Sequence, residues 1–222
     1  MHQISNCVYA HDDLLEWDIP TKRLPNPYHD FPYMLIKGVL TPQECRAITS
    51  FVRDSKEHHT ASLRGGNVNS HIRQTDIYTL PLEYTSLYET RFDLLRQRIE
   101  TFFALSLTRS TPLQVLGYNE GAFYIKHADD SSELRDREGH TVGYVSSAPE
   151  RKLSTVLFAN DAFEGGELLF NYLYDAQGNL IKVQPKSGDM LVFLSNPYFA
   201  HEVLPVTKGF RLSLVQWHDA LL

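Results

Sequence analysis

The residues best suited to chemistry in this chain are two histidines and one aspartate. His127 and Asp129 lie two positions apart in "YIKHADD", inside a run that reads as a β-strand, and His201 opens the later run "HEVLPV". Residues i and i+2 of a strand point to the same face, so His127 and Asp129 should project together. Two imidazoles and one carboxylate on one face of a metal leave the opposite positions open, as in non-haem Fe(II) oxygenases. The three residues therefore form a candidate iron site if the fold brings His201 beside the pair.

Each of these ligands also has a plain structural interpretation. His127 and Asp129 read as a surface pair at the end of a strand, and His201 reads as a buried histidine with satisfied hydrogen bonds. A second His-x-Asp pair, His11 and Asp13 in "HDD", has no strand pattern around it. The pair alone therefore cannot identify a metal site, and the position of the third ligand decides between the two interpretations.

The last apolar run of the chain carries a second functional feature. Arg211 and Ser213 lie at i and i+2 in "GFRLSLVQW", and a permanently charged guanidinium in an apolar strand is costly without an anionic partner. A guanidinium fork and a hydroxyl suit one end of a dicarboxylate whose other end chelates iron. 2-Oxoglutarate has that shape, so the sequence predicts that Arg211 and Ser213 contact it.

Composition narrows the classes of protein to consider. The chain has 222 residues, of which 42% are hydrophobic and 22% charged, as expected for one ordinary globular domain. Its formal net charge of -6 argues against nucleic acid as the main partner. No apolar run has the length of a membrane span and the N-terminus lacks a signal-peptide pattern, so we expect a cytoplasmic protein with no membrane partner. The two cysteines, Cys7 and Cys45, lack zinc-binding spacing, so any metal needs histidine and carboxylate ligands.

Helices are expected in the first half of the chain. Residues 1–32 contain several prolines and no clear periodicity, which predicts an irregular arm lying on the domain. Thr41 and Glu44 have the spacing of a capping box, which predicts a helix that runs to about Ser55. A second helix is expected over residues 86–105, where apolar side chains recur at helical spacing.

The second half of the chain has a β-rich pattern. From about residue 112, eight short β-rich runs alternate with turn residues almost to the end. Helices followed by antiparallel strands predict a mainly β protein of the α+β class: a jelly-roll barrel, or double-stranded β-helix, with helices packed on one face. We expect a single domain over residues 33–222, with helical support at 33–110 and the jelly-roll core at 112–218. The long polar segment 130–151 follows the His-x-Asp run and predicts a lid or binding loop.

These motifs, in this order, resemble a known family. The run "YNEGAFYIKHADD" is followed by "FEGGELLF", "VQPKSGDMLVF" and "HEVLPVTKGFR", and it is preceded by "LTPQECRAITSFV" and "SHIRQTDIYTL". Together they look like the prolyl 4-hydroxylase-like group of 2-oxoglutarate- and Fe(II)-dependent oxygenases, particularly its small bacterial members. The resemblance covers roughly residues 33–218. Each motif alone is weak, but their combination is specific.

The resemblance implies a set of residues and cofactors. His127, Asp129 and His201 would be the catalytic iron ligands, and Arg211 and Tyr118 would contact 2-oxoglutarate. O2 would be the oxidant, 2-oxoglutarate would be decarboxylated to succinate, and a substrate C–H bond would be hydroxylated. Ascorbate is an additional candidate cofactor.

Two positions depart from the collagen-type pattern. Leu168 stands where some relatives have a threonine that contacts 2-oxoglutarate, and Phe158 stands where a tyrosine is often found. The cosubstrate pocket should therefore be more apolar than in those relatives, and collagen-like specificity does not transfer.

The substrate stays open between several classes. The resemblance favours a prolyl residue in a peptide or protein, or a free amino acid or related small metabolite. A nucleic-acid demethylase is disfavoured, because Trp217 stands where such enzymes place a second arginine. Two alternatives to an enzyme are a cupin-like metal-dependent binder of small molecules and a catalytically silent jelly-roll binding module. The oligomeric state is not indicated by the sequence.

Overall fold

The computed structural model describes residues 2–5, 8–10, 33–55, 58–60 and 74–221. The His11 and Asp13 pair and Cys7 lie outside these residues. Within them, no helix combines the length and the apolar composition that are needed to cross a bilayer.

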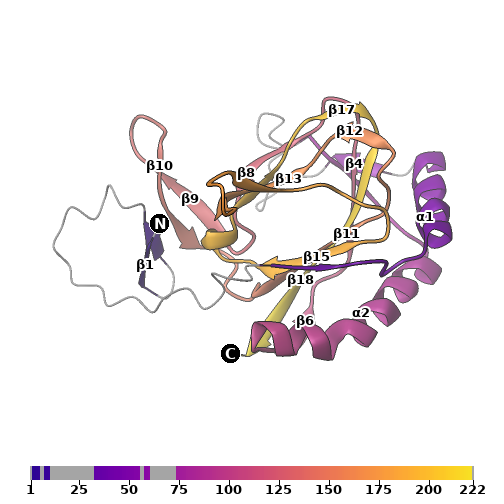
Figure 1. Cartoon of the computed structure of the whole chain (residues 1–222), viewed down its shortest axis with the longest axis horizontal. Coiled ribbons are helices and arrows are strands. Elements are labelled where there is room, and N and C mark those ends of the chain that lie inside the picture. Colours follow the sequence, from indigo (N-terminus) through magenta and orange to yellow (C-terminus); the bar gives the residue numbers. More distant parts are fainter. Residues whose placement is uncertain (1, 6–7, 11–32, 56–57, 61–73, 222) are drawn as a thin grey trace.

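Two antiparallel sheets form the barrel (Figure 1). The larger sheet has the order β3 (Tyr33–Ile36), β15 (Met190–Leu194), β11 (Leu153–Phe158), β18 (Arg211–Leu221), β7 (Gln114–Tyr118), β5 (Asp76–Tyr78) and β4 (His58–Thr60), and β6 (Ser106–Ser110) also pairs with β18. The smaller sheet has the order β14 (Leu180–Val183), β13 (Leu168–Tyr174), β16 (His201–Val203) and β8 (Tyr124–His127). The expected eight runs thus supply four strands to each sheet, and the predicted double-stranded β-helix is confirmed.

The structure also contains a short two-stranded sheet. It pairs β12 (Phe163–Gly165) with β17 (Val206–Gly209). Gly165 is the last residue of β12 and has φ 73°, and a Cβ there would approach the carbonyl oxygen of Pro205 to 2.3 Å. Glycine is therefore required at this close approach, which explains one of the turn signals in the sequence.

The segment predicted as a lid or binding loop contains a β-hairpin, so the expectation of a loop without secondary structure was wrong, whereas its role as a lid stays a prediction. Residues 130–151 contain β9 (Ser131–Arg135) and β10 (Thr141–Ser146), and β10 also pairs with β2 (Val8–Ala10). The arm was likewise expected to be irregular, yet its described part forms β2 and β1 (His2–Ser5). The hairpin is rich in polar residues because much of it stays exposed, so its strands lack the apolar alternation by which strands are recognised.

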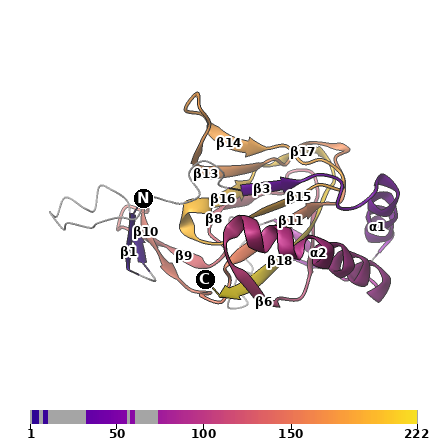
Figure 2. The same ribbon diagram turned by 60° about the horizontal axis from the view of Figure 1, so that its bottom comes forward.

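Two helices support the larger sheet. The first, α1 (Pro42–Asp54), begins at the predicted capping box: the Glu44 amide donates to Thr41 Oγ1 at 3.2 Å, and the Thr41 amide donates to Glu44 Oε2 at 2.7 Å. The second, α2 (Leu82–Phe103), begins four residues before the expected position of 86. Its N-cap is Pro81, which offers no side-chain cap and thus no recognisable start signal. Figure 2 shows both helices on the same side of the molecule as β11, β15 and β18.

A buried polar network joins α2 to the back of the larger sheet. His218 on β18 stacks on Phe92 of α2 with ring centroids 4.4 Å apart. Its Nδ1 is 2.8 Å from Ser110 Oγ and its Nε2 is 3.1 Å from Thr155 Oγ1, which in turn lies 2.9 Å from Tyr88 Oη. The network places a titratable side chain in a fully buried layer between helix and sheet.

This network predicts an acid-sensitive fold. Burial lowers the pKa of His218 from its ordinary 6.5 to about 3, with Arg96 acting in the same direction. Between these two pH values His218 binds a proton in the unfolded chain but not in the folded chain. The stability of the fold therefore falls as the pH drops below about 6.5, and it continues to fall toward pH 3. We expect His218 to account for a loss of about 2 kcal/mol of unfolding free energy between pH 7 and pH 5.

Urea unfolding at the two pH values measures this effect. His218→Gln should show a shallower loss of stability between pH 7 and pH 5 than the wild type. His140→Gln, at an exposed position, serves as the matched control and should keep the wild-type dependence. Equal pH dependence in wild type and His218→Gln would contradict the prediction.

Candidate active site

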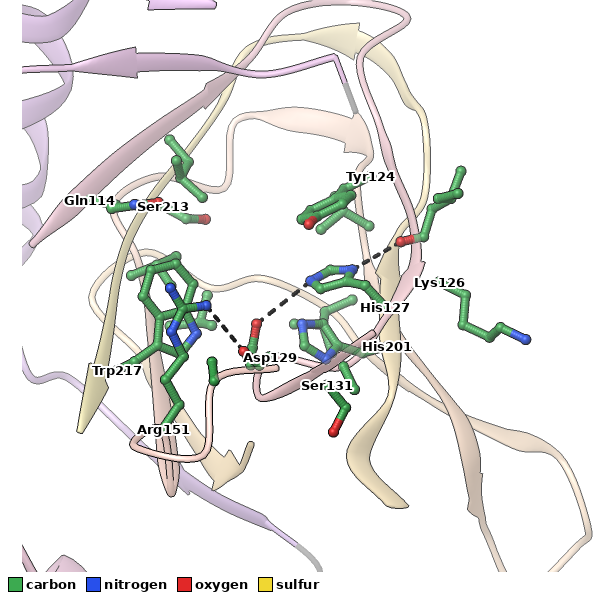
Figure 3. Close-up of a pocket in the computed structure, with 18 of the residues that line it drawn as sticks. Gln114, Tyr124, Lys126, His127, Asp129, Ser131, Arg151, His201, Ser213 and Trp217 are labelled. Carbon is green, nitrogen blue, oxygen red and sulfur yellow. Dashed lines mark hydrogen bonds and ion pairs between the residues drawn. The ribbon is translucent and has the colours of Figure 1, made fainter. Parts of the chain in front are cut away.

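The fold brings the three predicted ligands together at the open end of the barrel (Figure 3). His127 ends β8 and His201 begins β16, and the two residues are direct partners in the register of these strands. Asp129 lies just beyond β8, where the chain bends, and its Oδ1 is 3.7 Å from His127 Nε2. One ligand atom from each side chain lies within 4.8 Å of the others. The imidazoles and the carboxylate therefore converge on one point. Asp129 was expected within the strand, but it lies two residues after the end of β8.

Backbone carbonyls orient both imidazoles. His127 Nδ1 donates to the Ile125 carbonyl at 2.9 Å, and His201 Nδ1 donates to the Phe199 carbonyl at 3.0 Å. A carbonyl oxygen only accepts, so in the neutral rings Nδ1 carries the hydrogen and Nε2 presents a lone pair. This is the tautomer that a metal requires, and a fixed outer hydrogen bond is the usual partner of a metal-binding histidine.

Both imidazole rings are held by packing. Tyr124 stacks on His127 with ring centroids 3.7 Å apart. His201 is 5% exposed and packs edge-on against Phe193 with centroids 4.9 Å apart, just after the short 3-10 helix Pro197–Phe199. These contacts restrict rotation of the rings, so the ligand geometry exists before any ion binds.

The Asp129 carboxylate is held at its second oxygen. Ser154 Oγ donates to Asp129 Oδ2 at 2.6 Å and lies 2.8 Å from Ser195 Oγ, and both hydroxyls are buried. Burial by itself raises the pKa of Asp129, but His201, His127, Ser154 and Arg151 together hold that pKa below its ordinary value. The carboxylate is therefore ionised and leaves Oδ1 directed at the imidazoles.

Arg151 forms a hydrogen bond with the backbone of Asp129. Its Nη1 donates to the Asp129 carbonyl at 3.0 Å, and its guanidinium lies 3.9 Å from the centroid of the Trp217 ring. Neither Arg151 nor Ser154 was predicted as a site residue. A polar Ser154 within the apolar run "LSTVLFA" was the one available signal, because a serine on a buried strand face needs a partner.

The predicted cosubstrate residues lie deeper in the barrel. Arg211 is 1% exposed, pairs with Tyr118 across β18 and β7, and holds its guanidinium 4.7 Å from the Tyr118 ring centroid. Burial lowers the pKa of Arg211, whereas Tyr118 raises it. Arg211 Nε and Ser213 Oγ are buried without a hydrogen-bond partner in the part of the chain that the structure describes. The barrel thus holds a buried cation and an unpaired hydroxyl on one strand face.

One cavity connects the two ends of this arrangement. It has a volume of ≈ 760 Å³ and is lined by the three ligand residues and by Arg211, Tyr118 and Ser213. Within the barrel, apolar side chains line it together with Arg211, Ser213 and Gln114, and its lining also includes residues of β9 in the unexpected hairpin. A dicarboxylate of the size of 2-oxoglutarate fits within it, because drug-sized ligand sites begin at about 300 Å³.

Another histidine and two aromatic residues differ in their relation to the cavity. His140 sits at the tip of the hairpin with a side chain that is 74% exposed, next to Asp136 and Glu138, and does not line the cavity. Phe170 is fully buried in the core, whereas Trp217 lines the cavity.

The chain is similar to a family of oxygenases and to several hydroxylases. The family model described as "2OG-Fe(II) oxygenase superfamily" matches residues 113–219. Prolyl 3-hydroxylase 1 of Gallus gallus is 26% identical over 83% of this chain, which spans only 28% of that protein. A PKHD-type hydroxylase of Xylella fastidiosa is 28% identical over 86% of this chain and 78% of its own length. A prolyl-4-hydroxylase structure from Pseudomonas putida is 28% identical and has a TM-score of 0.64, covering 86% of this chain and 94% of that chain. This chain thus spans less than a third of the prolyl 3-hydroxylase and most of the length of the other two proteins.

Proposed function

Through residues 113–219 this chain belongs to the 2OG-Fe(II) oxygenase superfamily, and on that premise we propose that it is a 2-oxoglutarate- and Fe(II)-dependent hydroxylase. His127, Asp129 and His201 would hold the metal, and Arg211, Ser213 and Tyr118 would receive the far carboxylate of 2-oxoglutarate. The observation that carries the proposal is the convergence of two Nε2 lone pairs and one carboxylate at one end of a cavity with a buried guanidinium at its other end.

Two histidines and one carboxylate are the donor set of an open iron site, whereas a structural metal site has all of its coordination positions filled by protein ligands. Two imidazoles and one carboxylate leave positions open for a chelating cosubstrate and O2. When bound, iron and 2-oxoglutarate supply the oxidation: one oxygen atom of O2 enters a substrate C–H bond, and the other enters succinate as CO2 is released. Arg211 and Ser213 orient the cosubstrate, and the apolar barrel walls exclude water from it. A silent module or a cupin-like binder is disfavoured, because neither requires the buried guanidinium.

A prolyl residue of a peptide or protein is the substrate class that we propose. Several relatives of this chain are named for prolyl hydroxylation. A free amino acid is the second candidate, because the cavity could also enclose a small molecule. The departures at Leu168 and Phe158 leave the particular substrate open.

Two measurements test the proposal in sequence. Under anaerobic conditions, Fe(II) and 2-oxoglutarate together should give a metal-to-ligand absorption band in the visible region. With O2, proline-containing peptides and free amino acids should be screened for a mass increase of about 16 Da, the mass of the inserted oxygen, with succinate measured in parallel. A protein that forms no band would not be the proposed enzyme.

Ser154 gives a sharper prediction about metal binding. Replacing Ser154 with Ala removes the donor to Asp129 Oδ2, so the carboxylate loses one of the contacts that fix its orientation. Outer hydrogen-bond partners of metal ligands are typically worth about 10- to 100-fold in affinity. We expect Ser154→Ala to weaken anaerobic Fe(II) or Co(II) binding by about 10-fold or more. Ser187→Ala, a serine distant from the cavity, should bind these ions like the wild type; equal affinities in all three proteins would contradict the assignment.

A further inference from the structure

The cavity carries a charge opposite to that of the whole chain. The chain has a formal net charge of -6, yet the side chains that line the cavity include more cations than carboxylates. The cations are Lys126, Arg135, Arg151 and Arg211, and the carboxylates are Asp129 and Glu133. With both imidazoles neutral, four cations and two carboxylates give the lining a formal balance of +2. An acidic protein thus contains a cavity that should attract anions.

The proposed metal and cosubstrate leave this balance unchanged. Fe(II) brings two positive charges and 2-oxoglutarate brings two negative charges, so together they add none. Asp129 and Arg211 are the charged residues proposed to hold them. The other charged residues of the lining keep an excess of positive charge that neither group uses: Lys126, Arg135 and Arg151 against Glu133.

Two of these cations share a single carboxylate. Lys126 Nζ lies 3.3 Å from Glu133 Oε1, and the Arg135 guanidinium is paired with Glu133 Oε2. Glu133 also accepts hydrogen bonds from Thr141 and Tyr144, so its two oxygens serve several donors. One carboxylate cannot neutralise two cations, and a second carboxylate beside them would gain charge-assisted hydrogen bonds.

Arg151 places a third cation beside the metal ligands. Its guanidinium covers the Trp217 ring at 3.9 Å, and its Nη1 donates to the Asp129 carbonyl at 3.0 Å. A backbone carbonyl has no full charge, so this hydrogen bond leaves the positive charge of Arg151 in place. Figure 3 shows Arg151 on one side of the three ligand residues and Lys126 on the other. A substrate that reaches the ligands therefore lies between cationic side chains.

We propose that the cavity selects a substrate with a carboxylate close to the carbon that is hydroxylated, and that Lys126, Arg135 and Arg151 receive this carboxylate. This inference rests on the proposed function and extends it, because it adds a charge requirement to the substrate. An acidic side chain beside the proline of a peptide and the α-carboxylate of a free amino acid offer the same chemistry. The two sources are separate arms of the test.

The test uses the enzyme with Fe(II) and 2-oxoglutarate under anaerobic conditions. The visible absorption band is scored first, and its absence would mean that the proposed function fails rather than the charge selection. With the band present, its change measures the binding of three acetylated peptide amides. These peptides differ only in the residues that flank a central proline, which are aspartate, asparagine or lysine. Free L-proline and L-prolinamide, which lacks the carboxylate, form the second arm.

The aspartate peptide should bind at least about 5-fold more tightly than the asparagine peptide, because about 5-fold is the upper value for one exposed ion pair and three cations act here together. The lysine peptide should bind most weakly. These differences should shrink as the ionic strength rises from about 0.01 M to about 0.15 M, since the Debye length falls from about 30 Å to about 8 Å. If a free amino acid is the source of the carboxylate, L-proline should exceed L-prolinamide by the same factor.

Two substitutions on β9 should act in opposite directions. Arg135→Gln removes a cation and should weaken binding of the preferred carboxylate probe by about 2- to 5-fold. Glu133→Gln removes the competing carboxylate but keeps a hydrogen-bonding side chain, so it should strengthen that binding by a similar factor. Arg151 stays unchanged because it also supports Asp129. Arg137→Gln removes a charge from the same hairpin, but Arg137 does not line the cavity, so this control should bind like the wild type.

Three outcomes would overturn the inference. The first is an aspartate peptide that binds no more tightly than the asparagine peptide, together with L-proline that binds no more tightly than L-prolinamide. The second is a band that none of these probes perturbs. The third is an Arg135→Gln variant that keeps the wild-type preference, or that loses 2-oxoglutarate affinity instead, which would assign this cation to the cosubstrate.

Discussion

His127→Ala is expected to abolish both metal binding and substrate-dependent succinate release. The imidazole supplies one of only three protein ligands proposed here, and its Nε2 faces Asp129 at 3.7 Å. Outer partners of metal ligands already change affinity by about 10- to 100-fold, so loss of a ligand should exceed about 100-fold. Anaerobic Fe(II) titration measures the first effect, and succinate release with an accepted substrate measures the second.

The folded state should survive this substitution. The His127 side chain is 18% exposed at the cavity, whereas His201 packs into the aromatic core, so His127 is the better position to change. Circular dichroism and thermal unfolding should match the wild type without metal. His140→Ala, at the exposed hairpin tip, is the control for loss of a histidine and should release succinate like the wild type. Equal succinate release from His127→Ala and wild type would defeat the proposed mechanism.

Arg211→Met is expected to change cosubstrate binding and stability in opposite directions. No carboxylate forms an ion pair with Arg211 among the residues that the structure describes, although the guanidinium is 1% exposed. Removing one member of a buried charge pair at an interface costs about 2–5 kcal/mol, which corresponds to a loss of about 30- to 5000-fold in 2-oxoglutarate affinity. In the ligand-free protein, methionine removes a buried charge that has no ionic partner among the described residues, so the unfolding temperature should stay the same or rise.

Thermal unfolding with and without 2-oxoglutarate measures both the stability of the ligand-free protein and the binding of the cosubstrate. Wild type with metal should gain stability from added 2-oxoglutarate by mass action, whereas Arg211→Met should gain none. Arg98→Met replaces an exposed arginine on α2 and controls for the general loss of a charge. A variant that unfolds at lower temperature but keeps its 2-oxoglutarate affinity would show that Arg211 has a structural role only.

The sequence contained most of the information about the barrel. Strand composition and turn residues located the eight jelly-roll strands, and the capping box located the start of α1, because these signals are local. The start of α2 was misplaced, because Pro81 provides no capping side chain. The hairpin of β9 and β10 was missed altogether. Its pairing with β2 joins residues that are far apart in the chain, and no local pattern encodes such a contact.

The candidate site was predictable to the level of residue type and spacing. The shared strand face predicts that His127 and Asp129 act together, and the structure brings the distant His201 beside them. The partners of Asp129 were not predictable, because Ser154, Ser195 and Arg151 reach it from β11 and from connecting segments.

The cavity is lined by strands that differ in how tightly they are tied to the core, and this difference decides where the sequence can change. Two of the proposed cosubstrate residues, Arg211 and Ser213, lie on β18, whose opposite face is fixed to α2 through His218 and Phe92. Substitutions of the apolar residues of β18 should therefore disturb catalysis and folding together. The opposing wall includes β9, which belongs to a hairpin outside the barrel sheets and pairs only with β10 in the described structure. Libraries that aim to alter selectivity should therefore begin at β9, where sequence can change with the least effect on the catalytic barrel.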